Sequence, residues 1–431
     1  MTAMTVREED GQRPAEAPFV EGADVPRRVR HVGYLLVLAV WTLPLLTPAG
    51  PGNTGIADVT IGAAMVMTMI WLYRTSARVI LPYSLGMGVL MTAGLIAALH
   101  HSAAYSGVAI VQDLFMLLWG AAVANAVRNP YLLRVFLRAW CWSGIAWASV
   151  LVFGRLAGIN ALAGVTSANG GRAALTFHDP NLAANYLLCA LMVLLATRAI
   201  QRRWIRFLGV AVILTATFFT GSNGAMVGLV IGLSVATVTR ILKTHGPVSA
   251  IAVVAFLVLL VGVAGPHVDP SALQQKAAGS VPLLADSVGR TDSSGSEREI
   301  LFSEGLRLFN TGDLIGVAPG RTKHTLANAG ASYVKEAHND YMGTLVERGV
   351  LGGIGLIVLI AAAGVRLTRV TFWPLRPNVA ALVPRPEYLF GLAFALLASG
   401  FFYEVLHFRH LWAFLGLVAG LDMLRGRQWL R

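Results

Sequence analysis

The chain has 431 residues, of which 56% are apolar and only 13% are charged, and its formal net charge is +12. A soluble globular protein carries about a quarter charged residues, so the composition argues against a soluble enzyme and favours a membrane protein. Cys141 and Cys189 both lie in apolar runs, which gives neither a disulfide framework nor a metal cluster and predicts buried thiols.

Residues 1–30 mix acidic residues, arginine and proline without an apolar core. This pattern predicts a disordered cytoplasmic tail rather than a cleavable signal peptide. The first apolar run then serves as a retained signal anchor.

Twelve apolar runs follow the tail. A helix needs about 20 predominantly apolar residues to cross a hydrocarbon core of about 30 Å, so we predict an all-α, polytopic transmembrane bundle of about twelve spans. Spans 1–9 fall within residues 31–265 and spans 10–12 within 349–425. The predicted spans are 32–48, 57–74, 79–99, 107–127, 134–154, 182–200, 207–221, 224–242, 248–265, 349–367, 386–404 and 410–424.

The basic residues indicate the orientation of the spans, because Lys and Arg beside a span are retained in the cytoplasm. Every second connection is rich in arginine, whereas the short turns near 49–56, 100–106 and 222–223 contain neither Lys nor Arg. The pattern predicts that both termini, including the tail 426–431, are cytoplasmic. Because the charge is spread over many connections instead of one patch, no nucleic-acid partner is expected.

Two outer segments have room for a functional site, residues 155–181 and the large, partly helical extracytoplasmic loop 266–348. Both contain cations that the orientation rule does not favour outside the cell. The first contains Arg172. The second contains Lys276, Arg290, Arg298, Arg307, Arg321, Lys323, Lys335, His338 and Arg348. We interpret Lys276, Arg290 and Arg307 as contacts to anionic lipids and leave them out of the site.

Part of the large loop has a helical pattern. Ser296 and Glu299 form a capping-box pattern, and Phe302, Leu306 and Phe309 then recur at helical spacing. We predict an amphipathic helix at the membrane interface. Arg298 leans toward its apolar face, where it either binds an anionic partner or extends to phospholipid headgroups.

The loop ends in two further motifs. The turn GVAPGRTKHT carries Arg321 and Lys323, and its glycines could hold phosphate, although it lacks the P-loop spacing. In the following EAHNDYMGTLVERG, Asn339 is a plausible helix N-cap beside His338. Glu347 falls about 180° from His338 on the helix, so the two are not expected to form an acid–base pair. His338 could also be a capping or interfacial residue, and Glu347 a partner of Arg348 or of a neighbouring span.

These motifs together resemble the O-antigen ligase and polymerase superfamily of bacterial envelope enzymes. HNDYMGTLVERGVLGG resembles that family's His-Asn and Glu-x-Gly signature before a glycine-rich span. GRAALTFHDPNLAANY resembles its Arg, aromatic and Pro-Asn segment, and SEREILFSEGLRLF followed by GVAPG resembles its arginine helix and glycine turn. The family implies a multi-pass protein of the bacterial cytoplasmic membrane with an extracytoplasmic active site.

The resemblance implies transfer of a glycan from a polyprenyl-diphosphate carrier to a lipid or glycan acceptor, without a metal ion or cofactor. Arg172 and Arg298, with Arg321 as a third cation, would bind the diphosphate, and His338 would orient or deprotonate the acceptor hydroxyl. Asn181, Asn339, Tyr341 and Glu347 would support them. One position departs from the family, because Ser222-Asn223-Gly224 stands where many members have Ser-Arg-Gly.

The residues leave the precise activity open. A ligase that moves a finished glycan and a polymerase that extends repeats share the same signature. A transporter or flippase is the alternative from another class, and the intramembrane Asp113 would be its mark. A purely structural scaffold fits poorly with so many outer cations.

Overall fold

The structure is a computed structural model. It describes residues 25–46, 54–103, 105–166, 171–264, 293–311, 314–330, 334 and 339–425, and the single residues 272, 276 and 279. Within them the regular secondary structure is helical and there is no β-strand, only an isolated bridge between Leu375 and Arg425. The predicted tails 1–30 and 426–431 and most of the loop 266–292 lie outside the described residues, apart from residues 25–30 at the start of the bundle.

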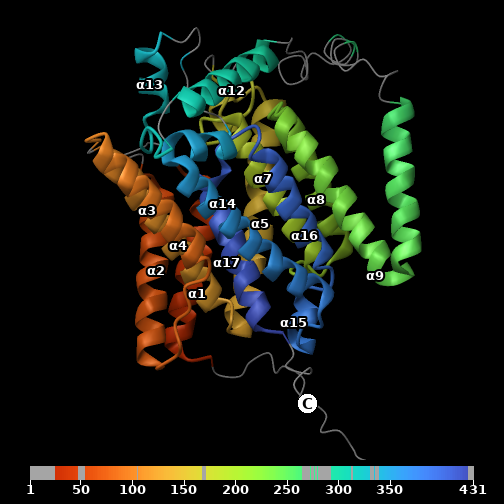
Figure 1. The fold of residues 1–431 in the computed structure, drawn as a ribbon. Helices are drawn as coiled ribbons and strands as arrows, with labels where there is room; N and C mark the ends of the chain where they lie inside the picture. The colour runs from red at the N-terminus through yellow and green to blue at the C-terminus, as the bar shows by residue number, and fades with distance from the viewer. Residues whose placement is uncertain are drawn as a thin grey trace, which may run out of the picture.

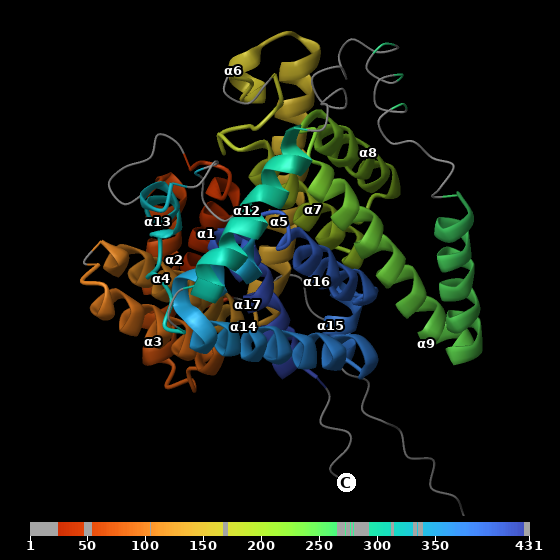
Figure 2. The ribbon, with the colours of Figure 1, turned by 45° about the horizontal axis from the view of Figure 1, so that its top comes forward.

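The helices form one bundle capped at one end by the loop helices α12 and α13 (Figures 1 and 2). They are α1 (Arg27–Thr42), α2 (Ile56–Arg74), α3 (Ser84–His100), α4 (Ser106–Ala126), α5 (Pro130–Leu156), α6 (Asn160–Ala163), α7 (Pro180–Ala196), α8 (Arg203–Phe219), α9 (Asn223–Ala264), α12 (Ser293–Thr311), α13 (Thr322–Asn328), α14 (Asp340–Phe372), α15 (Pro377–Leu382), α16 (Glu387–Ser399) and α17 (Arg409–Met423).

A helix overlaps each of the twelve predicted runs, which confirms the all-helical fold class. Five described helices are long and apolar enough to cross a membrane: Ile56–Arg74, Ser106–Ala126, Pro130–Leu156, Asn223–Leu260 and Asp340–Phe372. Three shorter apolar helices are Ser84–His100, Pro180–Ala196 and Glu387–Ser399. The number of twelve spans and their orientation stay predictions.

The bundle is built around α7 and α17. Residues 410–422 of α17 are all buried, and α7 is buried on nearly every face, including the thiol of Cys189. Helices that are apolar all round belong inside other helices rather than at a surface. The other helices pack around this centre, mainly as the pairs α1 with α2, α3 with α14, α4 with α17, α5 with α8 and α9 with α16. Cys141 is also buried, as the sequence predicted.

Two glycines with positive φ break long helices. At Gly246 (φ 83°), followed by Pro247, α9 reverses direction, so the predicted runs 224–242 and 248–265 form two separate rods (Figure 1). At Gly349 (φ 62°), α14 changes direction between its first segment, residues 340–348, and its long apolar part. A Cβ on Gly349 would come within 2.0 Å of the Leu314 carbonyl oxygen, so only glycine fits this bend.

Candidate functional site

The first segment of α14 is fixed at its start by Asn339. The Asn339 side-chain oxygen accepts hydrogen bonds from the backbone N–H groups of Tyr341 (2.9 Å) and Met342 (3.0 Å), so the predicted N-cap is observed. The Asn339 amide nitrogen donates to the carbonyl of Phe401 at 3.2 Å. Asn339 therefore positions both the helix start and its contact with the α16–α17 connection, residues 400–408. His338, the predicted catalytic residue, lies outside the described residues.

Two neighbours of Asn339 attach α14 to the same connection and to the end of α16. The Asp340 carboxylate accepts hydrogen bonds from the backbone N–H groups of Val405 (2.8 Å) and Leu406 (3.2 Å). The Tyr341 hydroxyl donates to the carbonyl of Leu397 at 2.8 Å. Of the predicted supporting residues, Asn339 thus binds the connection between α16 and α17, whereas Tyr341 binds the last turn of α16.

Arg172 lies in the connection between α6 and α7 and is only 6% exposed. Its Nε donates to the carbonyl of Thr220 at 2.7 Å, and its Nη2 donates to Asn181 Oδ1 at 2.7 Å. These two acceptors are neutral oxygens, and they hold the guanidinium in one orientation. Asn181 is held in turn by the start of α7, where Asp179 is the N-cap and Pro180 the first helical residue.

The α16–α17 connection joins the Arg172 group to the start of α14. The Tyr403 hydroxyl donates to Asn181 Oδ1 at 3.0 Å, the same oxygen that receives Arg172. Tyr403 is two residues from Phe401, the partner of Asn339, so their Cα atoms are at most about 7 Å apart. The structure thus brings Arg172, Asn181 and Asn339 together at one end of the bundle.

The turn between α8 and α9 contains the departure from the family. Ser222 caps α9 and lies 3.0 Å from the Tyr403 hydroxyl, whereas Asn223 is exposed. Arg172 binds Thr220, three residues before Asn223. A guanidinium therefore reaches this turn from another part of the chain, although the local arginine is missing.

Arg298 lies in α12, which confirms the predicted loop helix, but its side chain is outside the described part of the structure. The predicted position of this helix at the membrane interface stays a prediction, and the structure adds a contact with α14. Leu301 and Leu308 pack with Met342 and Val346 of α14, whereas Phe302 and Leu306 are 51% and 43% exposed. Gly305 lets α12 approach α14 closely, because a Cβ there would lie 2.8 Å from Met342 Cγ.

The glycine turn before α13 binds protein backbone. The N–H groups of Val317 and Ala318 donate to the carbonyls of Val346 and Glu347 at 2.8 and 3.0 Å. These two amides are therefore engaged in fixing the end of α14's first segment. Arg321, at the N-cap of α13, donates through Nη1 to the carbonyl of His101 at 3.4 Å. It thus borders α3, whereas Arg172 borders α7 and the α16–α17 connection.

The two charged residues before the Gly349 bend have structural partners. Glu347 Oε1 accepts a hydrogen bond from the Thr322 hydroxyl at 2.8 Å, which attaches α13 to α14. Arg348 Nη1 lies 2.7 Å from Asp113 Oδ2 of α4 and 3.3 Å from the carbonyl of Leu90 of α3. Asp113, the residue that would mark a transporter, is therefore part of a largely buried ion pair.

Sequence reasoning missed Glu404 and His407 of the α16–α17 connection. Together with α14 and α4 they line a small polar cavity of about 40 Å³, enough for one or two water molecules. Its polar lining residues include Asp113, Asn339, Asp340, Glu347, Arg348, Glu404 and His407. The only signal in the sequence was two ionisable side chains in a short outer turn.

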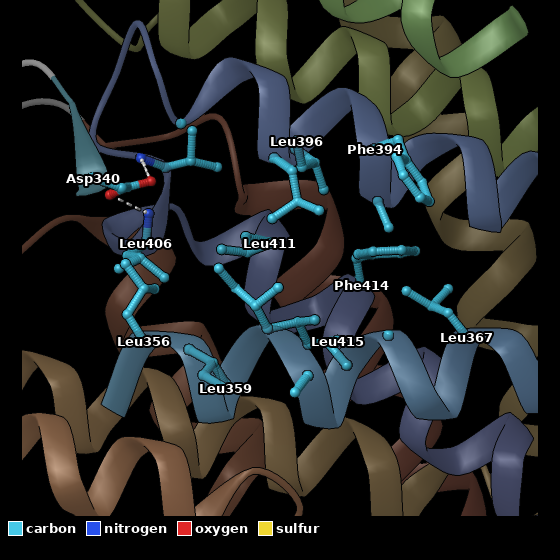
Figure 3. A pocket seen from close by; sticks show the side chains of 18 of the residues that line it. Asp340, Leu356, Leu359, Leu367, Phe394, Leu396, Leu406, Leu411, Phe414 and Leu415 are labelled. Atoms are coloured by element: carbon cyan, nitrogen blue, oxygen red, sulfur yellow. Dashed lines mark hydrogen bonds between the residues drawn. The ribbon is translucent and has the colours of Figure 1, made fainter. Parts of the chain in front are cut away.

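An apolar cavity of about 390 Å³ lies beneath the start of α14, between α14, α16 and α17 (Figure 3). Asp340 and Tyr341 lie at one end. The walls are formed by leucines and phenylalanines such as Leu359, Phe394 and Phe414. Such a lining fits a hydrocarbon chain rather than a sugar.

Helices of this length and composition, with a polar network at one end of the bundle, define a multi-pass α-helical membrane protein. Residues 208–357, from α8 to the first turns of α14's apolar part, match the family model described as O-antigen ligase. This match confirms the resemblance to the O-antigen ligase and polymerase superfamily, and it indicates a membrane glycosyltransferase of that type. No curated protein matches the chain significantly.

The match includes Arg298, Arg321, His338, Asn339, Tyr341 and Glu347 but not Arg172 or Asn181. The contacts of Arg172 and Asn181 are therefore an observation independent of the family match, and their role in a site stays a prediction. Among the described residues, no three His, Cys, Asp or Glu side chains are grouped to hold a metal ion. Metal independence remains a prediction from the resemblance.

Proposed function

We propose that the chain transfers a glycan from a polyprenyl-diphosphate carrier to an acceptor hydroxyl on the outer side of the bacterial cytoplasmic membrane, without a metal ion. One observation carries the proposal. Arg172, through Asn181 and Tyr403, shares the α16–α17 connection with Asn339, the neighbour of His338. These contacts support a site that has Arg172 and Asn339 at one end of the bundle, and residues 208–357 match the O-antigen ligase family model.

The reaction exchanges one bond at the anomeric carbon of the donor sugar. The acceptor oxygen forms a bond to this carbon while the bond to the carrier's phosphate oxygen breaks, and the electron pair leaves with the polyprenyl diphosphate. Guanidinium groups aimed at the departing phosphate stabilise the transition state. Arg172 and Arg298 have this role, with Arg321 as a further cation, and His338 accepts or directs the proton of the acceptor hydroxyl.

The apolar cavity gives the carrier's isoprenoid chain a place beside the reacting groups. Its outer end is formed by Asp340 and Tyr341, which follow His338 closely in the chain, and its walls continue along α14 as far as Leu367. A diphosphate held near the start of α14 would have its hydrocarbon chain directed along this cavity (Figure 3).

Complementation of a deletion strain tests the proposal. We expect His338→Ala and Arg298→Ala to abolish transfer of the glycan, measured by gel analysis of lipid-linked and acceptor-linked glycans at equal membrane levels of protein. Arg307→Gln is the matched control, because Arg307 pairs with Glu304 on the exposed side of α12. Full transfer by both alanine variants would refute the enzyme assignment.

The same assay separates a ligase from a polymerase. Loss of a ligase leaves long chains on the carrier lipid, whereas loss of a polymerase leaves single repeats. A transporter would instead move solute into proteoliposomes independently of His338. The ion pair of Asp113 with Arg348 disfavours transport, since a proton- or ion-coupled carboxylate needs to change its charge during the cycle.

A further inference from the structure

A large basic cavity is lined in part by Ala381 and Leu382 of α15. Helix α15 lies at the opposite end of the bundle from α12 (Figure 1). The volume of the cavity is about 1050 Å³. Three separate segments contribute its arginines: α5, the start of α8 with the connection before it, and the connection between α15 and α16. These are Arg134, Arg138, Arg198, Arg203, Arg206 and Arg385. Among the described residues that line it there is no Asp or Glu.

The segments that carry these arginines are fixed to one another by hydrogen bonds. The backbone N–H of Arg198 donates to the carbonyl of Leu382 at 2.9 Å, and that of Arg385 donates to the carbonyl of Ala196 at 3.2 Å. The Arg206 guanidinium donates to the carbonyl of Leu195 at 2.7 Å. The cluster is therefore a built feature of the fold, and its like charges repel one another across the cavity.

Another group of arginines shows how the chain neutralises such charge itself. Asp422 lies 3.0 Å from Arg366, 4.0 Å from Arg369 and 2.7 Å from Arg425. Near the basic cavity, by contrast, Glu387 is 5% exposed and pairs with Lys243 at 3.6 Å. Because no Asp or Glu is present in the described lining near Arg138, Arg198, Arg203, Arg206 and Arg385, the charge that balances them is best supplied by a bound anion.

The lining also shows which kind of anion fits. Between the arginines the cavity is lined by the apolar residues Leu137, Ile200 and Phe207. Helix α8 also has an apolar face that is exposed on the surface of the bundle. Trp204 and Phe207 on this face are 63% and 78% exposed. A ligand that satisfies both features has phosphate at one end and hydrocarbon at the other, and arginine forks bind phosphate well. Basic pockets between membrane helices bind lipids with several charges.

We propose that the cavity binds the headgroup of an anionic phospholipid that carries two phosphates, with its acyl chains along α8. By the predicted orientation this end is cytoplasmic, so the lipid comes from the inner leaflet. The site is separate from the proposed glycan-transfer site and does not depend on that activity.

Native mass spectrometry of the detergent-solubilised full chain tests the proposal. The probes are tetraoleoyl cardiolipin, with two phosphates, and dioleoyl phosphatidylglycerol, with one; inorganic pyrophosphate is added as a soluble competitor. We expect cardiolipin to bind at least tenfold more tightly than phosphatidylglycerol and to resist millimolar pyrophosphate. The variant Arg138→Gln/Arg198→Gln/Arg203→Gln changes exposed side chains only, and we expect cardiolipin binding to weaken by about 100-fold, roughly fivefold for each charge.

Arg240→Gln is the matched control, because Arg240 is an exposed arginine on α9 outside the cavity lining. It should bind cardiolipin as the wild type does. Equal binding of the two lipids, or unchanged binding by the triple variant, would overturn the proposal. Displacement of cardiolipin by equimolar pyrophosphate would also overturn it, because the occupant would then be a soluble anion.

Discussion

Arg172 and Arg348 are buried to the same degree, 6% and 7% exposed, but the acceptors described for them differ in kind. Arg348 lies 2.7 Å from a carboxylate, Asp113, and connects α14 to α4 and α3. Arg172 donates to an amide oxygen and a backbone carbonyl. A carboxylate cancels the charge that it orients, whereas a neutral oxygen orients the charge and leaves its field intact. The comparison distinguishes an ion pair that ties helices from neutral acceptors that hold a guanidinium in one orientation.

The largest expected effect tests the structural role of Arg348. We expect Asp113→Asn to lower the free energy of unfolding by about 3–5 kcal/mol, because Arg348 is then a buried cation without its counterion. Thermal unfolding of the purified protein measures the change. The double variant Asp113→Asn/Arg348→Met should recover a large part of the loss, because it removes the uncompensated charge. An unchanged unfolding temperature in Asp113→Asn would show that the pair is not a tie between helices.

The next effect tests the functional role of Arg172. We expect Arg172→Ala to reduce glycan transfer by about 100- to 1000-fold, the range found when one group that stabilises a developing anion is removed. Arg172→Lys should recover little, since an ammonium does not have the fork that spans Thr220 and Asn181. Transfer is measured in membranes at equal protein levels, with Arg307→Gln as the control. Loss of folded protein instead of activity would place Arg172 beside Arg348 as a structural residue.

Apolar spacing was sufficient to predict the helices but not which faces of the loop helix pack. Each of the twelve runs coincides with a helix because a run of apolar residues specifies a helix locally. On α12, however, Phe302 and Leu301 belong to different apolar stripes, and the packed stripe is chosen by its partner on α14. Gly305 permits the close contact with Met342 and thereby favours packing of the stripe that contains Leu301.

The candidate site shows the same limit. Asn181 lies nine residues from Arg172, and Asn339 carries the N-cap pattern, so both could be found from local sequence. Tyr403 could not be found from local sequence, because it is 222 residues away in the chain from Asn181, the residue that it binds. The role of Glu347 was also hidden, since its partner Thr322 is on a separate short helix. Long-range contacts of this kind depend on the packed bundle rather than on residue type.

The smallest expected effect concerns the hydroxyl that joins the Arg172 group to the α16–α17 connection. Tyr403→Phe removes the donor to Asn181, so the amide and the arginine that it orients lose one restraint. A single neutral hydrogen bond contributes about 1 kcal/mol, and we expect transfer to fall by roughly fivefold. The measurement is the rate of transfer for each folded molecule.

Tyr83→Phe is the control that separates orientation from stability. The Tyr83 hydroxyl also donates one hydrogen bond, to the carbonyl of Leu415, but at the start of α3 and away from Arg172. Tyr403→Phe also removes the contact with the Ser222 hydroxyl, so it should lose at least as much stability as Tyr83→Phe, and only Tyr403→Phe should lose transfer. If the two variants transfer equally well, Tyr403 stabilises the bundle without orienting Arg172, and the neutral acceptors alone are sufficient to hold the guanidinium in place.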